Sequence, residues 1–198
     1  MKKIIRLISL LLTLALLCST ITSCDGGTNG SSSTNNGETS GNTNDGTNPS
    51  LPSYGWEVGK RCIPTDLELV LGGGTVNITD YAGKIVVINF WGTWCGPCRS
   101  ELPHFSEVAD EYSDSVVILT VHSNYSIANA PAYVEENYSD SKMIFAKDDS
   151  AESYYSVLNP GEGAYPITMV LDKDGVITYK VIGAISKATL VAEINKAK

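Results

Sequence analysis

One continuous apolar segment that runs directly into a pair of cysteines constrains the fold most strongly. Residues 85–90 read Ile-Val-Val-Ile-Asn-Phe, a composition typical of a strand buried on both faces of a sheet. Cys95 and Cys98 follow after four more residues. From about Pro97 the apolar residues show helical spacing, at Leu102, Phe105, Val108, Ala109 and Tyr112. The cysteine pair is therefore predicted at the junction of a buried strand and a helix.

The remaining chain after about residue 54 alternates between strand-like and helix-like segments. Strands are expected, several of them around glycine-containing turns, at residues 67–71, 75–78, 116–121, 167–171 and 176–182. Helices are expected over residues 128–138 and 151–158, and after Ser186, a residue type that caps helices. Strands and helices in this order predict one α/β domain, with a mixed sheet covered by helices on both faces.

Charge excludes one large class of partners. The chain has 22 acidic and 14 basic residues and a net charge of −8. Binding to a nucleic acid backbone requires clustered Lys and Arg, and no basic stripe follows Arg6. We therefore expect no nucleic acid partner. We find no internal repeat and no second change of composition, and we expect a monomer.

The N-terminus has the features of an export signal. Three basic residues among the first six precede an apolar run over residues 7–17, which is shorter than the roughly 20 residues of a membrane-spanning helix. Residues 21–24 read Ile-Thr-Ser-Cys and resemble a bacterial lipobox, which predicts cleavage before Cys24 and a lipid on that cysteine. Ordinary cleavage nearby and an uncleaved anchor are the alternatives.

Residues 24–53 consist mostly of Gly, Ser, Thr and Asn. Such a segment cannot bury enough apolar surface to offset the entropy lost on ordering, so we interpret it as a disordered tether. As a flexible chain it would span about 30 Å. We thus divide the chain into a lipoprotein signal peptide (1–23), a tether (24–53) and a folded domain (54–198). The domain is expected at the outer, extracytoplasmic or periplasmic, face of the cytoplasmic membrane.

The cysteine pair is suited to redox chemistry because of its position. At a helix N-terminus, the positive end of the helix dipole favours thiolate over thiol, and the thiolate is the nucleophile. Pro97 suits the first helical turn, and the two-residue spacing lets Cys98 close a disulfide with Cys95. We expect Cys95 to attack a substrate disulfide and Cys98 to resolve the mixed disulfide. No cofactor is expected beyond the redox-active Cys95–Cys98 disulfide.

Two other interpretations of the pair compete with this one. A zinc site would need two more ligands, which only Cys62, His104 and His122 could supply, and no second Cys-x-x-Cys occurs. No metal site is therefore expected. A purely structural disulfide would not need a tryptophan before it or Gly-Pro inside it. Neither histidine is expected to be catalytic, and the ten tyrosines are interpreted as scattered core and surface residues.

Cys62 is the one cysteine of the folded part outside the pair. Free cysteines are often buried and inert, so we interpret Cys62 as a core residue. The alternative is a third redox position that forms an intermolecular or regulatory disulfide.

Trp94-Cys95-Gly96-Pro97-Cys98 resembles the thioredoxin motif, and residues 58–198 resemble the TlpA/ResA-like branch of extracytoplasmic thioredoxins. The matching segments are Asp-Tyr-Ala-Gly-Lys at 80–84, Asn-Phe-Trp-Gly-Thr-Trp at 89–94, Glu-Leu-Pro at 101–103 and Tyr-Pro-Ile-Thr at 165–168. The resemblance implies a thioredoxin-like fold, with a central mixed sheet and an extra N-terminal β-hairpin. It also implies thiol–disulfide oxidoreductase activity.

The resemblance assigns substrate binding to residues beside the cysteines, namely Trp94, Gly96, Pro97, Tyr165 and Pro166. Pro166 would follow a cis peptide bond and present its backbone to a bound substrate strand. The alternative is a trans proline at the start of a strand.

Glu101, one turn beyond the second cysteine, is implied to be catalytic, because a carboxyl group near a thiolate raises the thiol pKa and can move protons. The alternative is a solvated helix residue. Pro103 is expected to kink the helix. General thioredoxins carry a buried aspartate where Asn89 stands, so proton transfer would fall to Glu101 or to water.

The function expected from these features is reduction of disulfides in exported proteins, with apocytochrome c among the substrates that the resemblance suggests. The Gly-Pro between the cysteines is the dipeptide of reducing thioredoxins, and a membrane electron donor of the CcdA/DsbD type is the expected partner. One alternative is a thiol peroxidase of the AhpC/TSA type, but Phe90 stands five positions before Cys95, where we expect threonine in that class. The other is a non-catalytic lipoprotein binding module, although both cysteines are present.

Overall fold

The computed structural model describes residues 51–149, 153–158 and 164–198. The predicted signal peptide, the predicted lipidation site Cys24, and all but the last three residues of the predicted tether lie outside these residues. No helix in the described ranges is long and apolar enough to cross a membrane.

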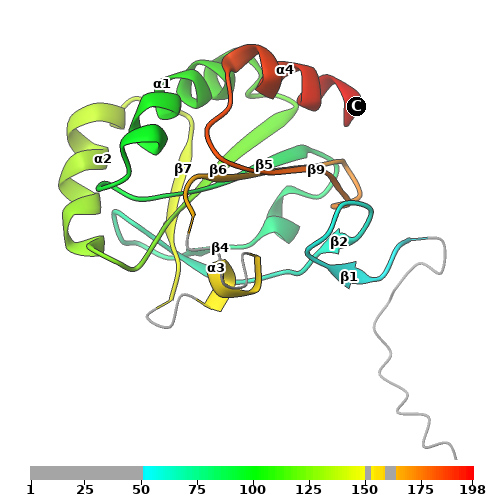
Figure 1. The fold of residues 1–198 in the computed structure, drawn as a ribbon, viewed down its shortest axis with the longest axis horizontal. Coiled ribbons are helices and arrows are strands. Elements are labelled where there is room, and N and C mark those ends of the chain that lie inside the picture. Colours follow the sequence, from blue (N-terminus) through cyan, green and yellow to red (C-terminus); the bar gives the residue numbers. More distant parts are fainter. Residues whose placement is uncertain (1–50, 150–152, 159–163) are drawn as a thin grey trace, which may run out of the picture. The chain divides into compact units, whose positions relative to one another are not determined.

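A seven-stranded mixed sheet forms the centre of the domain, with the strand order β4-β3-β7-β6-β5-β8-β9 (Figure 1). The strands comprise β3 (Leu67–Leu69), β4 (Thr75–Val76), β5 (Ile85–Trp91), β6 (Val116–His122), β7 (Ile144–Lys147), β8 (Ile167–Leu171) and β9 (Ile177–Ile182). Strands β5, β6 and β7 are parallel, whereas β3, β4, β8 and β9 pair antiparallel with their neighbours. This arrangement confirms the predicted mixed sheet.

The two central strands, β5 and β6, are buried at every position. They pair in register from Ile85 opposite Val116 to Trp91 opposite His122. A strand with neighbours on both edges and helices on its faces needs apolar side chains throughout, which explains the unbroken run in the sequence. Because β8 runs antiparallel to β5, its first residue, Ile167, pairs with Phe90 near the end of β5. The start of β8 therefore lies where β5 ends.

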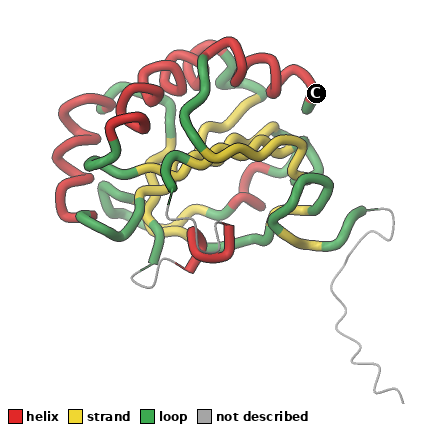
Figure 2. The backbone as a smooth tube through the Cα atoms, viewed as in Figure 1, coloured by secondary structure: helices red, strands yellow, loops and turns green. Residues whose placement is uncertain are grey.

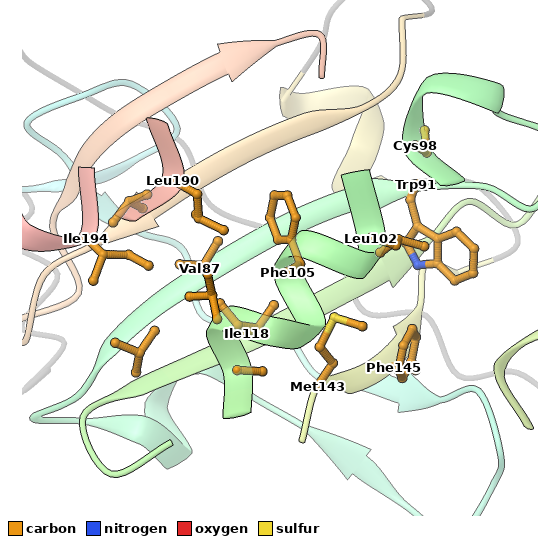
Figure 3. Packing of buried hydrophobic residues seen from close by; sticks show 14 of the residues in the cluster. Val87, Trp91, Cys98, Leu102, Phe105, Ile118, Met143, Phe145, Leu190 and Ile194 are labelled. Carbon is orange, nitrogen blue, oxygen red and sulfur yellow. The ribbon is translucent and has the colours of Figure 1, made fainter. Parts of the chain in front are cut away.

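Three α-helices cover one face of the sheet: α1 (Gly96–Glu111), α2 (Ala130–Tyr138) and α4 (Lys187–Lys196) (Figures 1 and 2). Figure 3 shows the packing beneath them, where Phe105 of α1 and Leu190 of α4 meet Val87 and Ile118 of the sheet. The predicted apolar face of α1 is buried, except that Tyr112 is half-buried. Pro103 lies inside α1, which continues for eight residues to Glu111.

The opposite face is covered by shorter elements: the 3₁₀ turn η1 (Ile78–Tyr81), the short helix α3 (Ser153–Leu158), and a separate parallel pair, β1 (Tyr54–Gly55) and β2 (Arg61–Cys62). A second 3₁₀ turn, η2 (Ile127–Asn129), precedes α2. Trp56, Cys62, Phe90, Tyr154 and Met169 belong to the core on this face. Helical elements thus lie on both faces as predicted, but the longer helices are all on one.

The sequence expectations miss two parts of the sheet arrangement. Strand β7 was not predicted, and neither was the β1–β2 pair. The predicted N-terminal hairpin is present as β3 and β4, and the predicted C-terminal hairpin as β8 and β9. Ser186 caps α4 as predicted, because its Oγ accepts a hydrogen bond from the Thr189 backbone N–H at 3.1 Å.

Candidate redox site

Cys95 and Cys98 lie at the N-terminus of α1 and are joined by a disulfide, with their Cα atoms 5.3 Å apart. Cys95 is the N-cap residue, and its Sγ accepts a hydrogen bond from the Cys98 backbone N–H at 3.2 Å. A thiolate at Cys95 would be stabilised by this N–H and by the positive end of the helix dipole. Cys95 is 4 % exposed and Cys98 is fully buried, so Cys95 is the more accessible of the two.

Glu101 lies one turn further along α1 and is 2 % exposed. Its Oε1 accepts a hydrogen bond from Asn89 Nδ2 at 2.8 Å, and its Oε2 accepts one from the Ile185 backbone N–H at 2.9 Å. Burial raises the pKa of Glu101, while these two hydrogen bonds act in the opposite direction. The alternative of a solvated helix residue is therefore wrong.

Asn89 connects Glu101 to strand β8, because its Nδ2 also donates to Thr168 Oγ1 at 3.1 Å. Its Oδ1 is buried and makes no hydrogen bond to any residue that the structure describes. A half-turn of the amide would present Oδ1 to Glu101 instead of Nδ2. The Asn89 amide can therefore donate to a Glu101 carboxylate through Nδ2 or accept from a protonated Glu101 through Oδ1. An aspartate carboxylate at this position could only accept.

The segment before β8 lies on the same side of the sheet edge as the redox pair, because Ile167 at the start of β8 pairs with Phe90 near the end of β5. The Tyr165–Pro166 peptide bond is cis, as predicted. The Tyr165 ring stacks on Tyr155 with the ring centroids 4.3 Å apart, and it contacts Trp94 edge-on at 5.2 Å. Tyr165, the residue before Pro166, thus contacts the tryptophan that precedes Cys95.

Trp94 is 45 % exposed and lies over the backbone of Gly92. A Cβ atom on Gly92 would lie 2.6 Å from Trp94 Nε1, so only glycine permits this position of the indole. Tyr125, from the loop after β6, contacts the other side of the cluster at 5.8 Å from Trp94. Gly96 and Pro97, which separate the cysteines, are also exposed. The surface around Cys95 is therefore aromatic and accessible.

Comparison with known proteins agrees with this geometry. A family model described as the AhpC/TSA family matches residues 58–180. The chain belongs to the AhpC/TSA family. It is 30% identical over 144 residues to a thiol-disulfide oxidoreductase ResA of Bacillus cereus, covering 71% of this chain and 78% of that protein. With the Cys95–Cys98 disulfide in place, the chain is a ResA-like thiol–disulfide oxidoreductase.

Solved structures show the same fold. The putative thiol:disulfide interchange protein DsbE from Chlorobium tepidum superposes with a TM-score of 0.60 at 21% identity, covering 71% of this chain and 97% of that one. The pneumococcal exposed lipoprotein thioredoxin Etrx1 from Streptococcus pneumoniae gives a TM-score of 0.58 at 26% identity, covering 68% and 99%. The thioredoxin-like fold predicted from the motifs is thereby confirmed.

His122 is a site residue that the sequence did not reveal. It is fully buried at the end of β6, and its ring lies edge-on to Trp91 at 4.8 Å. Its Nε2 accepts a hydrogen bond from the Thr93 backbone N–H at 2.9 Å, so Nδ1 carries the proton and donates to the Ser123 carbonyl. The neutral imidazole thus holds the loop that leads from β5 to Cys95. The position of His122 beside this loop follows from the register of β6 against β5, in which His122 pairs with Trp91. The sequence alone does not give that register.

Ring contacts connect three tyrosines to the surroundings of Trp94. Tyr125, Tyr155 and Tyr165 come from three separate segments, yet they are linked through ring contacts around Trp94. Tyr165 was predicted at the site from the sequence, and the ring contacts add the exposed Tyr125 and the buried Tyr155 to its surroundings.

Cys62 lies apart from the redox pair, in the core on the opposite face of the sheet. It is 2 % exposed, forms no disulfide with any described residue, and its Sγ lies 3.5 Å from Tyr154 Oη. Burial raises the pKa of the Cys62 thiol to about 11, although the hydrogen bond with Tyr154 acts in the opposite direction. These properties agree with the interpretation as an inert core thiol. Within the described ranges, no three His, Cys, Asp or Glu side chains are grouped to hold a metal.

Proposed function

We propose that this oxidoreductase acts outside the cytoplasm and reduces disulfides in exported proteins, with Cys95 as the nucleophile and Cys98 as the resolving cysteine. The observation that carries the proposal is the disulfide at the N-terminus of α1, in which Cys95 is the N-cap and the more exposed member. Helix N–H groups stabilise a thiolate at this position, and a thiolate is the attacking species.

The exchange begins from the reduced pair. The Cys95 thiolate attacks one sulfur of the substrate disulfide, a new S–S bond forms, and the other substrate sulfur leaves as a thiolate. Cys98, after losing its proton, attacks Cys95 Sγ and releases the second substrate sulfur. The substrate has then gained two electrons, and its two thiolates take up two protons, one lost by Cys98 and one from water. The protein is left with the Cys95–Cys98 disulfide seen in the structure. An external dithiol must reduce the disulfide again before the next cycle.

Glu101 is the group we propose to receive the proton of Cys98, directly or through water. It is the buried acid nearest to Cys98 along α1, one helical turn away. Burial raises the pKa of Glu101 above its ordinary value, which favours uptake of a proton by its carboxylate. Asn89 can hydrogen-bond to either protonation state of Glu101, as described above.

The residues around Cys95 are the proposed contact surface for the substrate. Trp94 directly precedes Cys95, Gly96 and Pro97 begin α1, and all three are exposed. Tyr165 and Pro166 come from the segment before β8, where Tyr165 is half-buried and Pro166 is buried. The backbone at Pro166 would pair with an extended substrate segment, whose disulfide would then lie over Cys95. Aromatic side chains offer large contact areas at low entropic cost, which suits a surface that meets many substrates.

We further propose that the protein is a lipoprotein, cleaved before Cys24 and held on the outer face of the membrane by the tether. The similarity to an exposed lipoprotein thioredoxin supports this location. A membrane protein of the CcdA/DsbD type would supply the electrons, and apocytochrome c is one candidate substrate. The protein would act as a monomer.

The reduction potential of the Cys95–Cys98 couple tests the proposal. The full-length protein would be equilibrated against glutathione or dithiothreitol, and the fraction of disulfide measured by thiol labelling. A potential near about −270 mV, as in thioredoxin, supports a reductant, whereas about −120 mV would make the protein an oxidant. Absence of any couple would favour a non-catalytic binding module, and rapid reduction of peroxide would favour a thiol peroxidase.

A further inference from the structure

A groove of about 390 Å³ lies against Trp94, on the side of the redox site that faces η2 and α2. Its lining includes Thr93 and Trp94, the two residues that directly precede Cys95. A substrate segment that places its disulfide at Cys95 would therefore reach this groove with a neighbouring side chain. The groove is separate from the Pro166 segment, which is not among the residues lining it.

The chemistry of the lining is selective. Two aromatic rings, Trp94 and Tyr133, and one carboxylate, Glu136, face the groove together with small polar groups such as Asn129. Glu136 is exposed and forms no ion pair with any residue that the structure describes. None of the described lining residues is a lysine or an arginine. Aromatic faces combined with a carboxylate attract ammonium and guanidinium groups.

We propose that this groove binds a lysine or arginine side chain of the substrate protein, next to the cysteine that Cys95 attacks. The inference rests on the proposed disulfide reductase function. It narrows the proposed substrates to protein segments that carry a basic residue near their disulfide. The overall charge of −8 acts in the same direction, because it repels acidic segments from the whole surface.

Helix α2 provides a matched control. Glu135 and Glu136 are adjacent in sequence and both exposed, but only Glu136 lines the groove. Glu135→Gln and Glu136→Gln therefore change the net charge equally and differ only in whether the lost carboxylate faces the groove. A general effect of charge would be the same in both variants.

The test measures kcat/KM of the full-length protein, with dithiothreitol as electron source, for three synthetic peptide disulfides. The peptides are identical except for Lys, Gln or Glu at one position beside the cysteine. We expect the Lys peptide to be preferred and the Glu peptide to be the poorest substrate. Glu136→Gln should lower the Lys-to-Gln ratio by about two- to fivefold, the scale of a solvent-exposed ion pair. Glu135→Gln should leave the ratio unchanged.

Three outcomes would overturn the inference. They are equal rates for the Lys and Gln peptides with the unaltered protein, an equal loss in both variants, and a loss in Glu136→Gln that is the same for all three peptides. A small uncharged disulfide serves as a separate substrate. Failure to reduce even that compound would contradict the proposed function, whereas its reduction without any Lys preference would contradict only the groove inference.

Discussion

Cys95 and Cys62 are two cysteines of one domain with nearly equal burial, 4 % and 2 % exposed, and opposite chemical character. Cys95 caps a helix and accepts a backbone N–H, and it forms a disulfide with Cys98. Cys62 lies among apolar side chains with the Tyr154 hydroxyl as its polar neighbour, and burial raises the pKa of its thiol to about 11.

The difference shows that burial alone does not decide the reactivity of a thiol. Removal from water disfavours both thiolates. Cys95 Sγ, however, accepts an N–H hydrogen bond at the start of α1, an arrangement that favours a thiolate, whereas Cys62 lies in a short strand and caps no helix that the structure describes. The sequence position before a helix, rather than exposure, is therefore the useful indicator of a redox cysteine. Four experiments test this comparison.

The largest effect is expected from removing each sulfur in turn. Cys95→Ser should lower the rate of disulfide reduction by at least about a thousandfold, as when other enzymes lose a nucleophile. Cys62→Ala should leave the rate unchanged, because Cys62 lies in the core on the other face of the sheet. The measurement is turnover of a peptide disulfide. A comparable loss in Cys62→Ala would give that cysteine a part in the redox cycle.

Alkylation of the reduced, folded protein should separate the two thiols by at least about a hundredfold, since a thiol with a pKa of about 11 is almost wholly protonated at pH 7. Iodoacetamide should label Cys95 rapidly and Cys62 only after denaturant is added. Mass spectrometry of digested protein would locate the label. Fast labelling of Cys62 in the folded protein would show that its core opens.

Substitution of His122 should lower the reactivity of Cys95 and leave that of Cys62 unchanged. In His122→Phe the half-buried Thr93 N–H loses its acceptor. A fully buried N–H without a partner costs about 1–3 kcal/mol, so we expect a cost near the lower end of this range. We expect disulfide reduction and Cys95 alkylation to slow by about tenfold, equivalent to about 1.4 kcal/mol. His122→Gln, which can place an amide oxygen near Thr93, should recover most of both rates. Equal rates in the two variants would limit His122 to a packing role.

Glu101 should give the smallest effect, visible in the pH dependence of stability. Its pKa is raised on folding above the ordinary value of 4.5, so in the window just above pH 4.5 the folded state holds a proton that the unfolded state has lost. Stability therefore falls as pH rises through that window, by at most about 1.4 kcal/mol per pH unit. Glu101→Gln should remove this component of the slope in urea titrations. An unchanged slope would show that burial does not perturb Glu101.

Much of the fold could be predicted because its signals are local. The apolar run of β5, the helical spacing after Pro97 and the turn between β8 and β9 each lie within a few consecutive residues. Strand β7 has only four residues and β1 and β2 two each, so no periodic pattern marks them. Their pairing depends on partners far away in the sequence.

The features of the site likewise fall into those marked by local motifs and those that depend on distant segments. The cysteine pair, Glu101 and the Tyr165-Pro166 segment belong to motifs and were found in the sequence. One of the two hydrogen bonds of the Glu101 carboxyl group comes from Ile185, 84 residues along the chain, and the position of His122 beside the Thr93 loop depends on the register of β6 against β5. Such properties arise from packing between distant segments, which a single sequence does not display.

The burial of Cys62 has a consequence for the maturation of the protein. While the domain is unfolded, Cys62, Cys95 and Cys98 could close any of three disulfides, and two of these would inactivate the enzyme. Once Trp56, Phe90 and Tyr154 pack around Cys62, only the pair at α1 remains open to exchange. Completion of the core on one side of the sheet thus restricts the cysteine pairing on the other to the redox-active disulfide.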